Sequence, residues 1–210
     1  MSIFDAMRRV ERLREADRRR QERNLGTGRL PPGQVLTEKF PVLHYGGIPR
    51  IDLADWTFEV WGSVEEPLVL DWDAFSALPQ TTITADIHCV TRWSKFDTTW
   101  TGVAGKDILQ LVKIKPEASH VMVHAYGGYT TNLPIEALLD EDVVFAILYD
   151  GKPLSPEHGW PMRLVVPRRY FWKSAKWCRG LEFMPHDRRG FWEMYGYHND
   201  GDPWKEERFG

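Results

Sequence analysis

The sequence predicts an α+β fold in which mixed β-sheets form the core and short helices connect the strands. Short β-branched or alternating segments outnumber helical ones, and the two kinds follow one another irregularly. The sequence has no internal repeat and no glycine-rich loop of the GxGxxG or GxxxxGK[ST] type. These observations argue against a doubly wound nucleotide-binding fold and favour a largely antiparallel or mixed sheet.

The composition indicates a chain that folds around a substantial core of its own. Of the 210 residues, 42% are hydrophobic and 13% aromatic, which is enough for one large domain. The formal net charge of -3 argues against a nucleic-acid-binding protein. No apolar run approaches the roughly 20 residues that a membrane span needs, and the first residues do not resemble a secretory signal. We therefore expect a cytoplasmic protein in which Cys89 and Cys178 remain thiols.

Residues 1–26 predict a charged amphipathic helix. Its apolar residues recur at helical spacing, while arginines and acidic residues fill the other faces. Because acidic residues are interleaved with the basic run at 18–20, we interpret it as a solvated or docking face, not as an anion-binding patch. Residues 27–39 are expected to form an extended linker, and residues 40–210 the main domain.

Within the main domain, strands are expected at 56–62, 68–70, 81–87, 100–103, 120–124, 143–149, 164–166 and 177–183. Helices are expected from Asp71, as N-cap, to Leu78, and over 105–112 and about 135–139, the last preceded by a polar lead at 130–132. Asp150-Gly151 predicts a hairpin turn. The segment 40–49 is rich in proline and glycine, so we expect an irregular loop of the kind that holds a ligand.

The segment 85–95 places Cys89 at the end of an apolar strand among basic and aromatic side chains. A thiolate is a soft, strongly donating metal ligand, and positive charge from Arg92, Lys95 or a protonated His88 favours it over the thiol. We interpret Cys89 as a metal ligand. The alternative, a small buried hydrophobic residue, is common for a lone cysteine and stays open on this segment alone.

A second segment, 158–177, carries the side chains of a phosphate-binding site. Arg163 precedes an apolar strand, and lysines flank the small residues Ser174 and Ala175. Guanidinium and ammonium groups bind phosphate oxygens, and small residues let backbone N–H groups approach closely. The aromatic residues at 170–172 and 177 are suited to wall a planar heterocycle. A basic loop with its aromatic residues in the core fits these residues equally well.

These two segments, the segment 127–134 and the aromatic tail 190–204 together resemble the sulfite-oxidase-type molybdopterin-dependent oxidoreductases, and in particular their small stand-alone members. The resemblance extends from about Phe40 to Phe209, with the motifs in the same order. It implies a molybdopterin-binding fold of mixed sheets. It also implies a molybdenum ion held by the dithiolene of one molybdopterin and by one protein cysteine.

The resemblance assigns roles to individual residues. Cys89 matches the molybdenum ligand, and Arg163 matches the arginine of the Gly-x-Pro-x-Arg motif. The tripeptide that holds the pterin phosphate corresponds to Ser174, Ala175 and Lys176. Three further cofactor contacts are implied at His158, which replaces a pterin-binding asparagine of a related bacterial methionine-sulfoxide reductase, and at His44 and Tyr45. Arg92 is a candidate for holding an oxyanion, and its alternative is a salt bridge to Asp86 or Asp97.

The activity that the resemblance implies is oxygen-atom transfer to or from a small oxyanion or oxide substrate. Animal and plant sulfite oxidases bind sulfite with an arginine that is absent from residues 37–42, which argues against sulfite. The sequence has no Cys-x-x-Cys-His haem-attachment motif, so a separate electron-transfer partner is expected. An oligomer is compatible with the sequence.

Two functions of other classes remain open. One is a cofactor-free module that binds an anion or carbohydrate, and the other is a hydrolase with Cys89 as nucleophile and His88 or His124 as base. Residues 88 and 89 would point to opposite faces of a strand, which is poor geometry for such a pair. The tail is expected to pack on the domain, either as a staple over the core or as a wall of the substrate funnel with Tyr197 or His198 near the metal.

Overall fold

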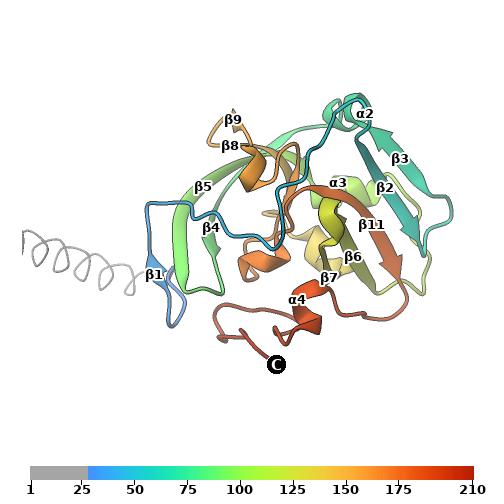
Figure 1. The fold of residues 1–210 in the computed structure, drawn as a ribbon. Coiled ribbons are helices and arrows are strands. Elements are labelled where there is room, and N and C mark those ends of the chain that lie inside the picture. Colours follow the sequence, from blue (N-terminus) through green and yellow to red (C-terminus); the bar gives the residue numbers. More distant parts are fainter. Residues whose placement is uncertain (1–27) are drawn as a thin grey trace, which may run out of the picture.

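The computed structural model of the protein describes residues 28–210 (Figure 1). The predicted helix within residues 1–26 lies outside the described residues. Two mixed β-sheets form the frame, as the sequence predicts. Short α-helices and 3₁₀ turns connect their strands, and none of the helices in the described part of the chain is long and apolar enough to cross a membrane.

The first sheet is built around the long strand β5 (Trp93–Ala104). It pairs in antiparallel fashion with β4 (Thr81–His88) and β8 (Val144–Tyr149), and in parallel with β1 (Val35–Leu36). Two short strands, β9 (Lys152–Pro153) and β10 (Arg163–Val165), each pair with β8 in antiparallel fashion. The predicted strand at 100–103 is therefore only the end of β5. The first half of β5 was not predicted from the sequence, because Lys95 and Asp97 interrupt its apolar pattern directly after the turn at Cys89.

The second sheet has the strand order β3 (Leu68–Asp71), β2 (Thr57–Gly62), β11 (Cys178–Met184), β6 (His120–Ala125) and β7 (Thr130–Pro134). β2 and β11 are parallel and the other pairs antiparallel. The polar segment 130–132 belongs to β7, so the prediction of a lead into a helix is wrong there. Thr131 and Asn132 are buried and bond to other buried polar groups, which compensates for the burial of their polar side chains on this edge strand.

The helices are short. They are α2 (Trp72–Ser76), α3 (Gly105–Gln110) and α4 (Phe191–Met194), with the 3₁₀ turns η1 (Tyr126–Gly128), η2 (Ile135–Leu139), η3 (Pro156–His158) and η4 (Phe171–Lys173). The Asp71 carboxylate accepts the Ala74 N–H, which confirms the predicted N-cap. Asp150 and Gly151 both have positive φ in the β8–β9 hairpin, as the turn prediction requires.

Two hydrophobic clusters hold this frame together. The larger one lies between the sheets, where Phe58 of β2 meets Phe145 of β8 with ring centroids 5.3 Å apart. The smaller one includes Ile87, Trp100 and Phe171 and packs on β4, β5, β8 and β10. Phe40, from the loop that precedes the second sheet, packs against this smaller cluster. It thereby draws the irregular segment 40–49 across the end of the first sheet.

Candidate functional site

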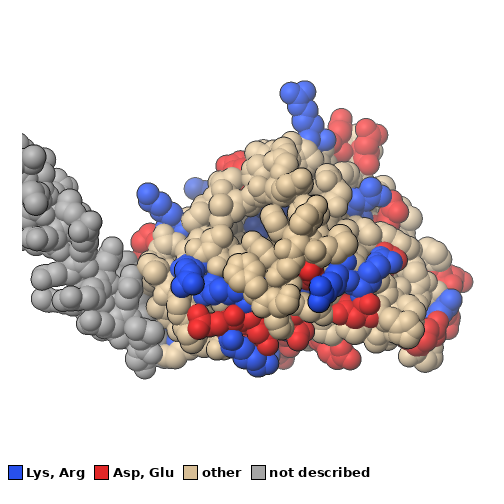
Figure 2. All heavy atoms as spheres, turned by 60° about the horizontal axis from the view of Figure 1, so that its bottom comes forward, with Lys and Arg blue, Asp and Glu red and all other residues tan. Residues whose placement is uncertain are grey.

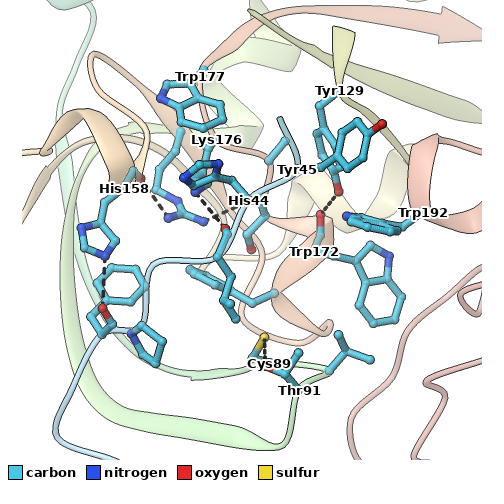
Figure 3. Close-up of a pocket in the computed structure, with 18 of the residues that line it drawn as sticks. His44, Tyr45, Cys89, Thr91, Tyr129, His158, Trp172, Lys176, Trp177 and Trp192 are labelled. Carbon is cyan, nitrogen blue, oxygen red and sulfur yellow. Dashed lines mark hydrogen bonds between the residues drawn. The ribbon is translucent and has the colours of Figure 1, made fainter. Parts of the chain in front are cut away.

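A cavity of about 280 Å³ lies where the β4–β5 turn, the loop 40–45, the segment 158–177 and the C-terminal tail meet (Figure 3). Segments that are distant in sequence therefore share one site. Cys89 and Thr91 lie at one end of it, Lys176 and Trp177 at another, and aromatic residues of the tail form a side. Figure 2 shows a hollow on a largely uncharged face, with the blue of basic side chains visible inside it.

Cys89 is the first residue after β4. Its N–H donates to Trp93 O at 2.8 Å and closes the turn that leads into β5. Cys89 is 8% exposed and lines the cavity, and its sulfur lies 3.2 Å from Thr91 Oγ1. Burial raises the pKa of the Cys89 thiol. The sulfur therefore keeps its proton until a metal cation displaces it, and metal binding must release a proton here.

Hydrogen bonds hold the turn that carries Cys89. Gln34 Nε2 donates to Cys89 O at 3.0 Å, and Arg208 Nη1 donates to Val90 O at 2.6 Å. Arg92 closes the turn by donating its N–H to Cys89 O at 3.0 Å, with a φ of 72°. Contacts from both ends of the described chain thus fix the direction of the Cys89 side chain.

Arg163 and Lys176 give another end of the cavity a positive charge. The Arg163 guanidinium is buried, donates to His158 O (3.0 Å) and Ser174 O (2.9 Å), and leaves Nε without a partner. Lys176 Nζ donates to Leu43 O (2.9 Å) and Glu157 O (2.8 Å). Neither cation forms an ion pair with a carboxylate in the described part of the chain.

The pKa values reflect this uncompensated charge. Burial lowers the pKa of Arg163 to about 9, and burial together with the charge of Arg163 lowers that of Lys176 to about 7. A buried cation without a counter-ion is costly unless an anion binds beside it. Gly159, at a φ of 114°, allows the two to approach, because a Cβ there would lie 3.0 Å from Arg163 Cβ and 3.2 Å from Lys176 Cβ. The arrangement is that of an anion site.

The structure brings most of the predicted site residues together. His44, Tyr45, Cys89, His158, Arg163, Ser174, Ala175 and Lys176 all line the cavity. The exposed side chain of Arg92 does not line it. Asp86 and Asp97, its alternative partners, are bound by Arg29 instead, at 2.6 Å each. Lys95 donates to Glu38 O at 2.8 Å.

The two histidines proposed as bases for a Cys89 nucleophile lie elsewhere. His88 Nδ1 is 2.8 Å from Ser94 Oγ, and burial lowers its pKa to about 4, so its ring is neutral at pH 7. His124 Nε2 is 2.9 Å from Glu182 on the second sheet. Neither ring lines the cavity. This geometry does not support the hydrolase alternative with either histidine.

Aromatic residues of the tail form a side of the cavity. Tyr197 stacks on Trp192, with centroids 5.0 Å apart and planes at 18°, and meets Trp172 edge-on at 5.0 Å. Tyr129 donates its hydroxyl to Trp172 O at 2.6 Å. Tyr129 was not foreseen as a site residue, although it lies in the segment 127–134 that carries part of the family resemblance. His198 does not line the cavity.

A buried ion pair fastens this wall to the domain. The Glu193 carboxylate of α4 lies 2.6 Å from Lys173 Nζ, and both side chains are fully buried. The same carboxylate accepts from Trp172 Nε1 and Thr131 Oγ1, both at 2.9 Å. The tail therefore packs on the domain, as expected, and also lines the cavity, and its roles as staple and as wall of a substrate funnel both stay predictions.

The family model described as "Oxidoreductase molybdopterin binding domain" matches residues 45–192, most of the chain that builds this cavity. The chain belongs to this family. It is 47% identical over 184 residues to the "Uncharacterized oxidoreductase YuiH" of Bacillus subtilis, covering 87% of this chain and 93% of that protein. These findings confirm the predicted family, and with it molybdenum and molybdopterin as the cofactor of the domain.

Two more distant members are larger proteins. The chain is 29% identical over 169 residues to the "Putative protein-methionine-sulfoxide reductase subunit YedZ1" of Azospira oryzae, covering 79% of this chain and 64% of that one. The solved sulfane dehydrogenase SoxCD from Paracoccus pantotrophus superposes with a TM-score of 0.62 at 25% identity, over 68% of this chain and 41% of that one. This likeness confirms the sulfite-oxidase-type fold.

The residues of the cavity fit a molybdopterin. The orphaned Nε of Arg163 and the unbalanced charges of Arg163 and Lys176 suit a phosphate group. The aromatic rings around them suit a planar heterocycle, and the Cys89 sulfur suits a soft metal. The donor set, the charge and the lining thus agree with the cofactor of the family.

Proposed function

We propose that this molybdopterin-binding oxidoreductase catalyses oxygen-atom transfer to or from a small substrate, with Cys89 as the protein ligand of molybdenum. The observation that carries the proposal is the pairing, in one cavity, of a single thiol with a buried arginine and a half-buried lysine, neither of which forms an ion pair with a carboxylate of the described residues. When bound, the cofactor supplies a metal that can exchange an oxygen atom while changing by two electrons.

The chain's own groups have distinct tasks in this proposal. Arg163 and Lys176 hold the pterin phosphate. The tripeptide 174–176 and His158 in turn hold the Arg163 guanidinium in place, since it donates to the carbonyls of His158 and Ser174. His44 and Tyr45 border the mouth of the cavity, where both are exposed. Trp192 and Tyr197 exclude water from the part of the cavity that contains Cys89, and they position the substrate there.

The charge of the cavity favours an uncharged oxide as substrate. Among the described residues, Arg163 and Lys176 are the basic side chains that line it, and the proposal assigns both to the phosphate. No lysine or arginine of the lining is then left for an oxyanion such as sulfite. A sulfoxide fits better, and the name of the Azospira relative points to the same class. The role of Arg92 in holding an oxyanion stays a prediction.

Each catalytic cycle needs two electrons from or to another molecule. Cys178, the other thiol of the chain, is fully buried and donates to Ala175 O, so it forms no dithiol with Cys89. We therefore propose a separate electron-transfer partner. A cytoplasmic location is also proposed, and the two free thiols support it.

Metal and pterin analysis tests the proposal. Protein purified from a molybdopterin-competent host is expected to hold about one molybdenum per chain and to reduce a sulfoxide with an artificial electron donor. Cys89→Ser should lose turnover while keeping its fold, because a hydroxyl is a harder and weaker ligand than a thiolate. Cys178→Ser is the matched control and should retain turnover. Full turnover by Cys89→Ser, or molybdenum-free wild-type protein with a filled anion site, contradicts the proposal.

A further inference from the structure

The Cys89 sulfur has a hydroxyl neighbour whose role follows from the chemistry of a metal-bound thiolate. Among the described residues, Thr91 is the one whose side chain bonds to it, with Oγ1 and Sγ 3.2 Å apart. In the free thiol either atom can donate this hydrogen bond. A metal-bound thiolate has no proton, so Thr91 must then be the donor and the sulfur the acceptor.

The turn holds this hydroxyl in place. Arg208 on Val90 O and Gln34 on Cys89 O fix the backbone on both sides of the sulfur. Threonine is stiff at χ1, so a fixed backbone also restricts the direction of Oγ1. Hydrogen bonds from the backbone N–H groups of Val90 and Thr91, like the one from the hydroxyl, favour the thiolate and lower the pKa of Cys89. The sulfur thus lies among preoriented donors, and Thr91 contributes the only one that a substitution can remove.

We propose that Thr91 is a positioning residue that sets the reduction potential of the molybdenum centre by donating its hydroxyl to the Cys89 sulfur. This proposal rests on the ligation of molybdenum by Cys89. A donor to a thiolate withdraws electron density from the metal–sulfur bond and so favours the more electron-rich, reduced state of the metal. Removal of the hydroxyl therefore lowers the potential, while the ligand itself stays in place.

Two variants separate the hydroxyl from the shape of the side chain. Thr91→Val keeps the branched shape and removes the donor, and Thr91→Ser keeps the donor. The potential is measured on holoenzyme by redox titration followed by electron paramagnetic resonance. Thr91→Val should shift it downward by about tenfold in the equilibrium constant, or about 59 mV for a one-electron couple. Thr91→Ser should stay within about a third of that shift.

Controls distinguish the possible failures. Molybdenum and pterin content should be equal in all three proteins, because the Thr91 side chain is exposed and its hydrogen bond goes to the sulfur, not to the cations of the anion site. Thr91→Ala serves as a second donor-free variant if the valine protein loads poorly. Wild-type potentials in both donor-free variants, or equal shifts with serine and valine, overturn the role of Thr91. An unchanged metal spectrum in Cys89→Ser instead overturns the ligation on which that role rests.

Discussion

Replacing Glu193 by leucine tests whether the buried ion pair with Lys173 fastens the aromatic wall of the cavity. The Glu193 carboxylate receives hydrogen bonds from the Lys173 ammonium at 2.6 Å and from Trp172 Nε1 and Thr131 Oγ1 at 2.9 Å. Burial already lowers the pKa of Lys173. Glu193→Leu therefore leaves a cation and two neutral donors without their acceptor in a site that water does not reach.

The structure sets the size of the effect. Removing one partner of a buried pair costs about 3 to 5 kcal/mol, because the other charge remains buried and uncompensated. For a chain of this size each kcal/mol lowers the melting temperature by about 2 to 4 °C, so Glu193→Leu should melt about 6 to 20 °C lower. Glu193→Gln keeps an acceptor for Trp172 and Thr131 and should lose less.

Urea and thermal unfolding of the purified variants measure this loss. The double variant Lys173→Met, Glu193→Leu should recover part of the stability, since no buried charge is left alone. Glu65→Gln, in the exposed pair with Lys113, is the matched control and should change stability by no more than about 0.5 kcal/mol. The reasoning is refuted if Glu193→Leu and Glu65→Gln lose the same amount, or if the double variant is less stable than Glu193→Leu.

Two further outcomes follow from the same geometry. In cofactor-free protein the pKa of Lys176 is about 7, below the ordinary value of 10.5, so its folded state holds fewer protons than its unfolded state between those values. The free energy of unfolding should accordingly rise with pH from about 7 toward 10, and inorganic phosphate should bind more weakly at pH 8.5 than at pH 6.5. Calorimetry of Lys176→Met should show neither pH dependence. If phosphate binding keeps its pH dependence in this variant, the anion binds elsewhere. Truncation after Pro185 should give insoluble or strongly destabilised protein, because it removes the buried Glu193 and Arg208 and the half-buried Trp192. A soluble truncated protein with the wild-type melting temperature would show that the tail is a wall and no staple.

The sequence predicted the strands well where a single residue pattern, such as a run of β-branched residues, dominated a segment. The segment 81–87 is rich in β-branched residues, and it forms most of β4, which leads directly to Cys89 as expected. The N-cap at Asp71 and the Asp150 turn depend on local chemistry, so they could also be read locally. β7 was missed because Thr131 and Asn132 are satisfied by Glu193 and Lys173, about 40 to 60 residues away. No local pattern carries that information.

The candidate site shows the same division. Cys89 and the basic segment around Arg163 were singled out from residue types and spacing, and both line the cavity. The lack of an ion pair at Arg163 and Lys176 could not be predicted, since Glu157 is near in sequence and the fold brings its backbone carbonyl to the Lys176 ammonium. The contact between Thr91 and the Cys89 sulfur likewise depends on a tight turn that Gln34 and Arg208 fix from distant positions.

X-ray absorption at the molybdenum edge tests the central claim most directly, because it counts the sulfur atoms bound to the metal. With one dithiolene and the Cys89 thiolate as ligands, the wild-type protein should show three sulfur neighbours and Cys89→Ser two, at equal molybdenum and pterin content. The Cys178→Ser control should keep three. Two sulfur neighbours in the wild-type protein, or three in Cys89→Ser, would contradict the ligation of molybdenum by Cys89.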